Sequence, residues 1–120
     1  MLKIDGDTIN ITRGDKGVIE LTIEGYTFAA GDTIEFRVYE RKGLDKLPVL
    51  TKEIEVKEEG TSVDLELTAE DTKIGDLKNK ATEYWYEIEL NDNQTIIGYD
   101  ENGPKKLMLY PEGAESNDTN

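Results

Sequence analysis

Three short segments of this 120-residue chain gather the oxygen-bearing side chains that could bind a metal ion. They are Asp5-Gly6-Asp7, Asn91-Asp92-Asn93 and Asp100-Glu101-Asn102. A calcium loop needs about six to eight oxygens, supplied by a spaced series of Asp and Asn residues that ends in Glu. None of the three segments has that spacing, so we predict solvated turns and no metal site within the chain. Calcium held between neighbouring subunits stays open as an alternative.

The residue types that most often perform acid–base or nucleophilic catalysis are scarce in this sequence. It has no histidine and no cysteine, and its only serines, Ser62 and Ser116, lie in no nucleophile motif. Glu87 and Glu89 resemble the carboxylate pair of a glycosidase, but they share the outward face of an alternating segment. Nothing in that segment would give them the different protonation states that acid–base catalysis needs. We therefore predict a non-enzymatic protein with no catalytic residues and no cofactor.

The tripeptide Arg13-Gly14-Asp15 has the sequence that integrins bind. Glycine and aspartate also favour tight turns, because they readily adopt the backbone conformations that turns require. The tripeptide lies between two alternating segments, and a role in cell adhesion would need an exported protein. We therefore predict a turn that joins two strands.

Composition limits the partners that this chain can have. Asp and Glu outnumber Lys and Arg by 27 to 14, and the formal net charge is −13. Such a surface repels phosphate backbones and anionic lipids, so we predict no nucleic-acid and no membrane partner. The opening MLKIDGD lacks a signal-peptide pattern, and no segment approaches the roughly 18 apolar residues of a membrane span. These features predict a protein that is cytoplasmic when synthesised.

The elements that must position these residues are predicted by hydrophobic alternation. Apolar side chains occupy every second position in Val63–Leu67 and again in Tyr84–Leu90, which predicts two half-buried strands. Between them, Thr68 and Asp71 have capping-box spacing, which predicts one short helical turn that ends at Gly75. A strand, a crossing turn and a second strand are how a β-sandwich passes its chain from one sheet to the other.

Further alternating segments, separated by turn residues, bring the expected total to about eight strands. With no long helix, this spacing predicts an all-β fold, an antiparallel immunoglobulin-like β-sandwich over residues 1–112. Residues 113–120 are polar and acidic, which predicts a disordered tail. The side chains expected to point into the core are Ile34, Phe36, Val38, Val63, Leu65, Leu67, Ile88 and Leu90.

Most of the chain, roughly residues 4–110, resembles a group of viral proteins. The similarity is carried by the opening IDGDTINITRGDKGVIELTI, by GDTIEFRVYER, and by LTAEDTKIGD followed by YWYEIEL. These stretches are similar to small β-sandwich proteins encoded in tail regions of phages and prophages of Gram-positive bacteria, relatives of the N-terminal domain of the phage baseplate upper protein. The resemblance implies a structural or accessory protein of the tail or baseplate, located in the virion after assembly. The implied partners are the protein itself or other tail proteins.

One departure from that family bears on the expected role. Baseplate upper proteins continue into further oligomerising segments, whereas this sequence ends just after the domain. A stand-alone accessory protein and a fragment of a longer assembly are therefore both expected.

Outward side chains are the candidates for contact with a partner protein. Alternation places Arg37, Tyr39 and Trp85 on outward faces, and protein interfaces favour these residue types. Three alternatives stay open for Trp85: a core position if the strand register is reversed, a protein contact, or a platform on which a sugar stacks. The last of these supports an alternative function, a carbohydrate-binding module for recognition of the host cell wall.

Overall fold

The computed structural model describes residues 1–40, 47–75, 79–98 and 103–111, where the chain forms nine strands and no helix. The predicted all-β class is therefore confirmed, and no helix of the described part is long and apolar enough to cross a membrane. The predicted tail and the Asp100-Glu101-Asn102 segment lie outside the described residues. The strands are β1 (Leu2–Asp5), β2 (Thr8–Thr12), β3 (Gly17–Leu21), β4 (Thr33–Tyr39), β5 (Leu50–Glu55), β6 (Val63–Leu67), β7 (Thr82–Leu90), β8 (Gln94–Ile97) and β9 (Lys105–Tyr110).

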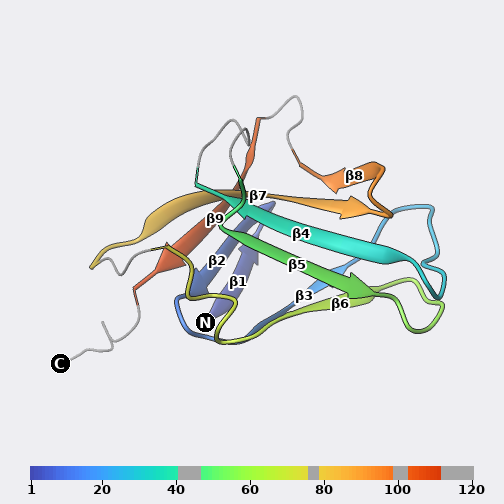
Figure 1. Cartoon of the computed structure of the whole chain (residues 1–120), viewed down its shortest axis with the longest axis horizontal. Helices are drawn as coiled ribbons and strands as arrows, with labels where there is room; N and C mark the ends of the chain where they lie inside the picture. The colour runs from blue at the N-terminus through green and yellow to red at the C-terminus, as the bar shows by residue number, and fades with distance from the viewer. Residues whose placement is uncertain (41–46, 76–78, 99–102, 112–120) are drawn as a thin grey trace.

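Seven of these strands form one large sheet, and the other two form a small sheet that packs on it. Six strands of the large sheet follow the order β1-β2-β9-β7-β4-β5, and the seventh, β8, also pairs with β7. The small sheet consists of β3 and β6. Figure 1 shows β3 and β6 running together below the long strands β4 and β5. The result is an open, sandwich-like arrangement of two layers.

One strand pair departs from the predicted antiparallel pattern. β2 runs parallel to β9, whereas the other strand pairs of the described residues are antiparallel. The large sheet is therefore mixed, and the prediction of a purely antiparallel sandwich is wrong. Parallel neighbours cannot be joined by a hairpin. This pairing instead brings together the first and last parts of the chain, a long-range contact that local alternation does not reveal.

The core lies between the two sheets and is built from the inward side chains of both. Ile34, Phe36 and Val38 of β4 are fully buried, and the Phe36 ring packs against that of Tyr86, with 5.7 Å between the ring centroids. All the side chains predicted to point inward are buried except Val63, which is half-buried where β6 begins. Burial of this kind is the main source of stability for a chain with no disulfide.

The connection that leaves β6 begins with the predicted pair of reciprocal hydrogen bonds. The Thr68 N–H donates to Asp71 Oδ2 at 2.8 Å, and the Asp71 N–H donates to Thr68 Oγ1 at 3.1 Å. These are the two bonds of a capping box. The backbone nevertheless forms only a turn here, so the predicted helical turn is not confirmed. Gly75 then takes a positive φ of 67°, which glycine adopts readily.

The Arg13-Gly14-Asp15 segment forms the predicted turn between two strands. Gly14 has a φ of 87°, and the Asp15 N–H donates to the Thr12 carbonyl at 3.0 Å. The buried Thr72 hydroxyl accepts from the Gly14 N–H and donates to the Asp15 carbonyl, at 2.9 Å in each case. The turn is thereby attached to the connection that follows β6.

Candidate functional site

Arg37 lies at the centre of a charged cluster on the outward face of the large sheet. It belongs to β4, whose inward side chains fill the core, so alternation turns Arg37 away from that core. Directly across from it on β7 is Glu87, and the next outward pair along the same strands is Glu35 and Glu89. The two strands therefore bring three carboxylates to one guanidinium group.

The contacts within this cluster are close and shared. Arg37 Nη2 lies 2.8 Å from Glu87 Oε2 and 2.8 Å from Glu89 Oε1. Arg37 Nε donates to Glu87 Oε2 at 3.1 Å, and Nη1 donates to Glu35 Oε1. The four side chains expose only 18–23% of their surface, so water screens their charges incompletely. With three carboxylates and one guanidinium group, the cluster retains a net negative charge.

Tyr39 adds a hydroxyl group to the cluster. It donates a 3.0 Å hydrogen bond to Glu87 Oε2, the oxygen that also accepts from Arg37. Burial, together with the hydrogen bond to Glu87 and its negative charge, raises the pKa of Tyr39 above its ordinary value. Burial opposes the charge of Arg37, but its hydrogen bonds with Glu89 and Glu87 outweigh that effect and raise the pKa of Arg37. Both groups therefore keep their protons at neutral pH.

Trp85 faces outward next to Tyr39, its cross-strand neighbour on β4. The residues on either side of it, Tyr84 and Tyr86, are each 2% exposed and fill the core. The alternative in which the register is reversed and Trp85 occupies the core is therefore wrong. Trp85 is half-buried, and its indole Nε1 is enclosed without an acceptor among the described residues. An enclosed N–H group without an acceptor costs about 1–3 kcal/mol.

The three predicted contact residues offer less surface than alternation suggests. All three lie on the outward face, but Tyr39 is only 6% exposed, and Arg37 is engaged by carboxylates. Alternation identifies the face to which a side chain points. It does not show how densely that face packs, because this depends on neighbours from other strands. Of the three, Trp85 has the largest apolar side chain, and it is half-buried.

Two residues that the sequence reasoning missed, Met108 and Tyr110 of β9, share this face. Both are half-buried, and the Tyr110 hydroxyl donates to Asn10 Oδ1 at 3.2 Å. Alternation within β9 is a signal that they point outward, but only the pairing of β9 with β7 places them on the same face as Trp85. In that register Lys106 lies directly opposite Trp85, and Met108 lies opposite Glu83, the next outward residue of β7. The surface formed by Arg37, Tyr39, Trp85, Met108 and Tyr110 is termed the outer face below.

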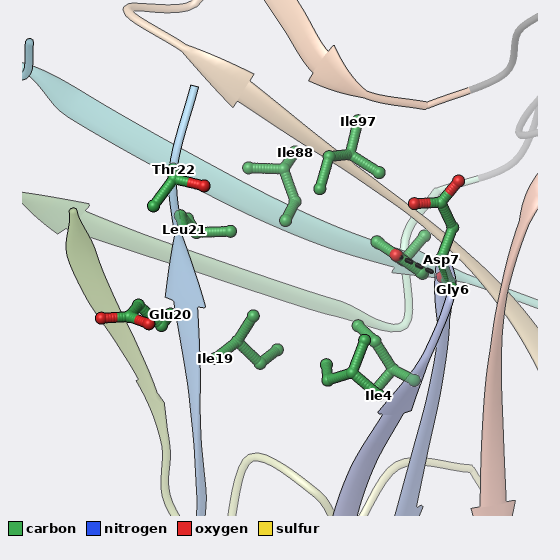
Figure 2. A pocket seen from close by; sticks show the side chains of 11 residues that line it. Ile4, Gly6, Asp7, Ile19, Glu20, Leu21, Thr22, Ile88 and Ile97 are labelled. Carbon is green, nitrogen blue, oxygen red and sulfur yellow. Dashed lines mark hydrogen bonds between the residues drawn. The ribbon is translucent and has the colours of Figure 1, made fainter. Parts of the chain in front are cut away.

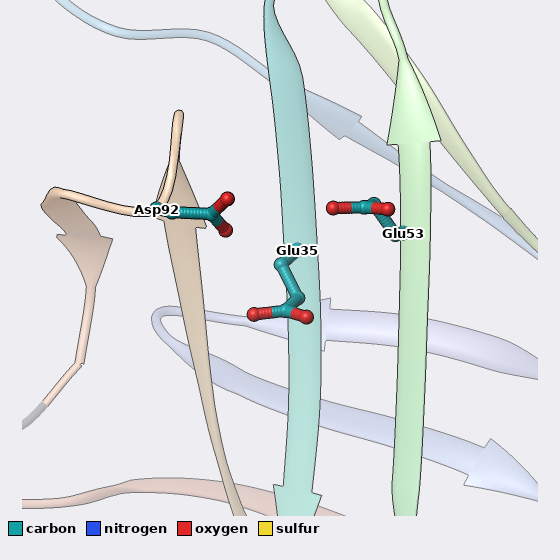
Figure 3. A group of neighbouring side chains, drawn as sticks. All are labelled: Glu35, Glu53 and Asp92. Atoms are coloured by element: carbon teal, nitrogen blue, oxygen red, sulfur yellow. The ribbon is translucent and has the colours of Figure 1, made fainter.

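A second acidic group lies at one end of the Arg37 cluster. Figure 3 shows its members, Glu35 of β4, Glu53 of β5 and Asp92 of the turn that follows β7. One carboxylate oxygen from each lies within 4.8 Å of the others, which is close enough for one cation to contact all three. Glu35 is already paired with Arg37, and the other two are exposed. The geometry therefore allows a cation but does not require one.

Comparison with models of protein families, with curated proteins and with solved structures found no match. The outer face combines aromatic and thioether side chains with fixed charges, which is a composition suited to recognition.

Proposed function

We propose that this protein is a non-enzymatic structural or accessory component of a phage or prophage tail or baseplate, and that it acts through protein–protein assembly. The observation that carries the proposal is the composition of the outer face. Protein interfaces are enriched in Trp, Tyr, Met and Arg. These residue types gather on the outward side of β4, β7 and β9. The resemblance of the sequence to small tail-region proteins supports the phage setting.

Trp85 is the expected anchor of such a contact. A partner that supplies a carbonyl acceptor would remove the cost of the unbonded indole N–H when the ring turns outward. The neighbouring Arg37 is already held by its ion pairs, so little side-chain freedom is lost on binding. The net charge of −13 repels identical free subunits, which favours association at the assembly site over premature aggregation.

We also infer an immunoglobulin-like topology for the scaffold. The order β9-β7-β4-β5 corresponds to the G-F-C-C′ order of a variable-type immunoglobulin sheet, and β3-β6 corresponds to the B and E strands of the facing sheet. Phe36 occupies the centre of β4, where antibody domains bury a tryptophan. The Tyr84 hydroxyl fills the space beside Gly75 in the preceding connection, much as in a tyrosine corner.

Incorporation into particles tests the proposed function. A tagged copy of the chain is expressed in a bacterium that carries the tail genes, particles are purified on a density gradient, and the chain is quantified by mass spectrometry. We expect the wild type in the particle fraction. The double variant Trp85→Ala, Met108→Ala should remain folded but leave that fraction. The control Val18→Ala removes an exposed apolar side chain from the small sheet and should be retained.

The carbohydrate-binding alternative needs an exposed aromatic platform. A half-buried Trp85 beside a Tyr39 that is 6% exposed provides little flat surface for stacking. Calorimetric titration with host wall polysaccharide distinguishes the two functions. Micromolar binding that is lost in Trp85→Ala, with no wild-type chain in particles, would replace the assembly proposal with the carbohydrate one.

A further inference from the structure

A cavity of about 360 Å³ opens between the two sheets, on the inner side of the large sheet. Its volume falls within the range of about 300–1,000 Å³ that is typical of ligand sites. Polar groups come from Asp7, Glu20, Thr22 and the Tyr86 hydroxyl, which already donates to the Asp7 carbonyl. The rest of the lining is mainly aliphatic, as Figure 2 shows, and its larger members are Ile4, Ile9, Ile19, Leu21, Ile88 and Ile97.

The cavity follows the edge of β3. The four consecutive residues from Ile19 to Thr22 all line it, although successive side chains of a strand point to opposite faces. A cavity that contacts side chains on both faces of β3 must lie beside the backbone of that strand. β3 pairs with β6 on one side, and no strand within the described ranges pairs with its other edge. β3 therefore presents unpaired backbone N–H and C=O groups toward the cavity.

The opposite wall is formed by β1 and the turn that follows it. β1 pairs only with β2 in the described part of the chain, and Ile4 and Gly6 line the cavity. Figure 2 shows Ile4 and Ile19 in the space between β3 and the paired strands β1 and β2. A space between two strand edges suits an extended segment, which can pair with a strand along its length. A strand from a second copy would bring its own sheet with it, and the β1 wall stands in the way of that sheet.

We propose that this cavity accepts an extended segment of a partner protein, which adds to the free edge of β3 as an extra strand. Main-chain hydrogen bonds to β3 would provide affinity, and alternate aliphatic side chains would fill the space against Ile88 and Ile97. This surface is separate from the outer face. Variants at the two surfaces therefore test the two proposals independently.

The charges at the rim of the cavity indicate which charged residues the bound segment should carry beside its aliphatic side chains. Glu20 is exposed at one wall of the cavity, and Asp7 lies at the other, 3.4 Å from the ammonium group of Lys105. Lys105 offsets part of the charge of Asp7, so Glu20 provides the stronger attraction for a cation. The net charge of −13 also attracts a positively charged segment. The preferred segment therefore carries Lys or Arg beside its aliphatic residues.

The test uses the full chain and the probe peptide acetyl-Lys-Val-Ser-Val-Ser-Val-Lys-amide. Amide hydrogen exchange is followed by NMR with and without the peptide. We expect the unpaired amides of β3 to exchange at least about tenfold more slowly when the peptide is saturating. A peptide with Glu in place of Lys should bind about fivefold more weakly at low salt, and the difference should narrow as salt is added. A peptide with N-methylated backbone amides should not slow exchange, because it cannot pair with a strand.

Two variants locate the binding within the cavity. Ile4→Trp fills the space from the β1 wall and should abolish the slowing, whereas Val18→Trp, at a similarly exposed position outside the cavity, should keep it. Exchange protection between β4 and β7 verifies that both variants are folded. Unchanged β3 exchange with the Lys peptide, or equal slowing by the N-methylated peptide, would overturn the proposal. Slowing without peptide that grows with protein concentration would also overturn it, in favour of a second copy.

Discussion

Thr68 and Asp71 hold each other through two hydrogen bonds of opposite direction, at 2.8 and 3.1 Å. Asp71 Oδ2 also lies 2.9 Å from the ammonium nitrogen of Lys52 on β5. A motif that is local in sequence therefore connects the turn after β6 with a strand of the other sheet. This contact adds to the core packing that holds the small sheet against the large one.

Replacement of Asp71 by Asn should have a pH-dependent cost. Burial opposes the charged carboxylate, but the Thr68 N–H and Lys52 lower the pKa of Asp71 below its ordinary 3.8. A lowered pKa stabilises the fold above that ordinary value, and this contribution is lost as pH falls through the folded-state pKa. We expect Asp71→Asn to lower the free energy of unfolding by about 1 kcal/mol at pH 7. The difference should shrink in acid, as measured by urea unfolding.

The control for that experiment is Glu70→Gln, which changes an exposed neighbour in the same turn. It should leave stability nearly unchanged at both pH values. An equal loss for Asp71→Asn at neutral and acidic pH would show that the variant acts through the lost hydrogen-bond acceptor and not through the lost charge.

Leu65 tests the register of the small sheet. It is completely buried on β6, opposite Ile19 of β3. Leu65→Ala removes buried methyl groups and should cost about 2–5 kcal/mol of unfolding free energy. Its exposed neighbour, changed by Glu66→Ala, should cost less than about 0.5 kcal/mol. Comparable values for the two variants in urea unfolding would contradict the assigned register.

Arg37→Gln should expose repulsion among the carboxylates around it. Without the guanidinium, Glu35, Glu87 and Glu89 lose their shared positive partner. We expect a loss of about 1–3 kcal/mol, smaller than for a fully buried pair because the cluster is partly exposed. Added salt should restore part of the lost stability. It screens the repulsion among the carboxylates, since the Debye length falls to about 3 Å at 1 M. Urea unfolding at low and high salt measures this effect.

The matched control is Lys57→Gln, whose ammonium group is exposed and 3.8 Å from Glu55. Its stability should change little at any salt concentration, because exposed pairs contribute little. A cost for Arg37→Gln that is independent of salt would show that packing of the arginine stem, rather than charge, is what the variant removes.

Trp85→Phe should separate stability from assembly. The variant removes the indole N–H that has no acceptor among the described residues while keeping an aromatic ring. We expect the isolated domain to be as stable as the wild type or up to about 1 kcal/mol more stable in thermal unfolding. Incorporation into particles should decrease. A loss of more than about 2 kcal/mol would contradict this expectation, because the indole would then stabilise the folded domain through its packing or through a partner of its N–H.

The sequence alone was sufficient for features that depend on nearest neighbours. Alternation correctly indicated the core side chains of β4, and of β6 apart from the half-buried Val63, because successive side chains of a strand point to opposite faces. For β7 it correctly placed Ile88 and Leu90 in the core but left the orientation of Trp85 open. The turn at Gly14 was also correctly predicted. Thr68 and Asp71 form the reciprocal bonds that their capping-box spacing allows, but the predicted helical turn is not confirmed. Each depends on residues a few positions apart. Their physical determinants are therefore present in the local sequence.

Only the tertiary structure decided which strands and surfaces meet. Alternation with a period of two residues assigns each side chain to a face but does not identify the neighbouring strand. It therefore left undetermined the parallel pairing of β2 with β9 and the placement of Met108 on the same face as Trp85. The same holds for the group of Glu35, Glu53 and Asp92. The cavity beside β3 exists because two strand edges from different sheets stand apart, a distance set by the packing of the entire core.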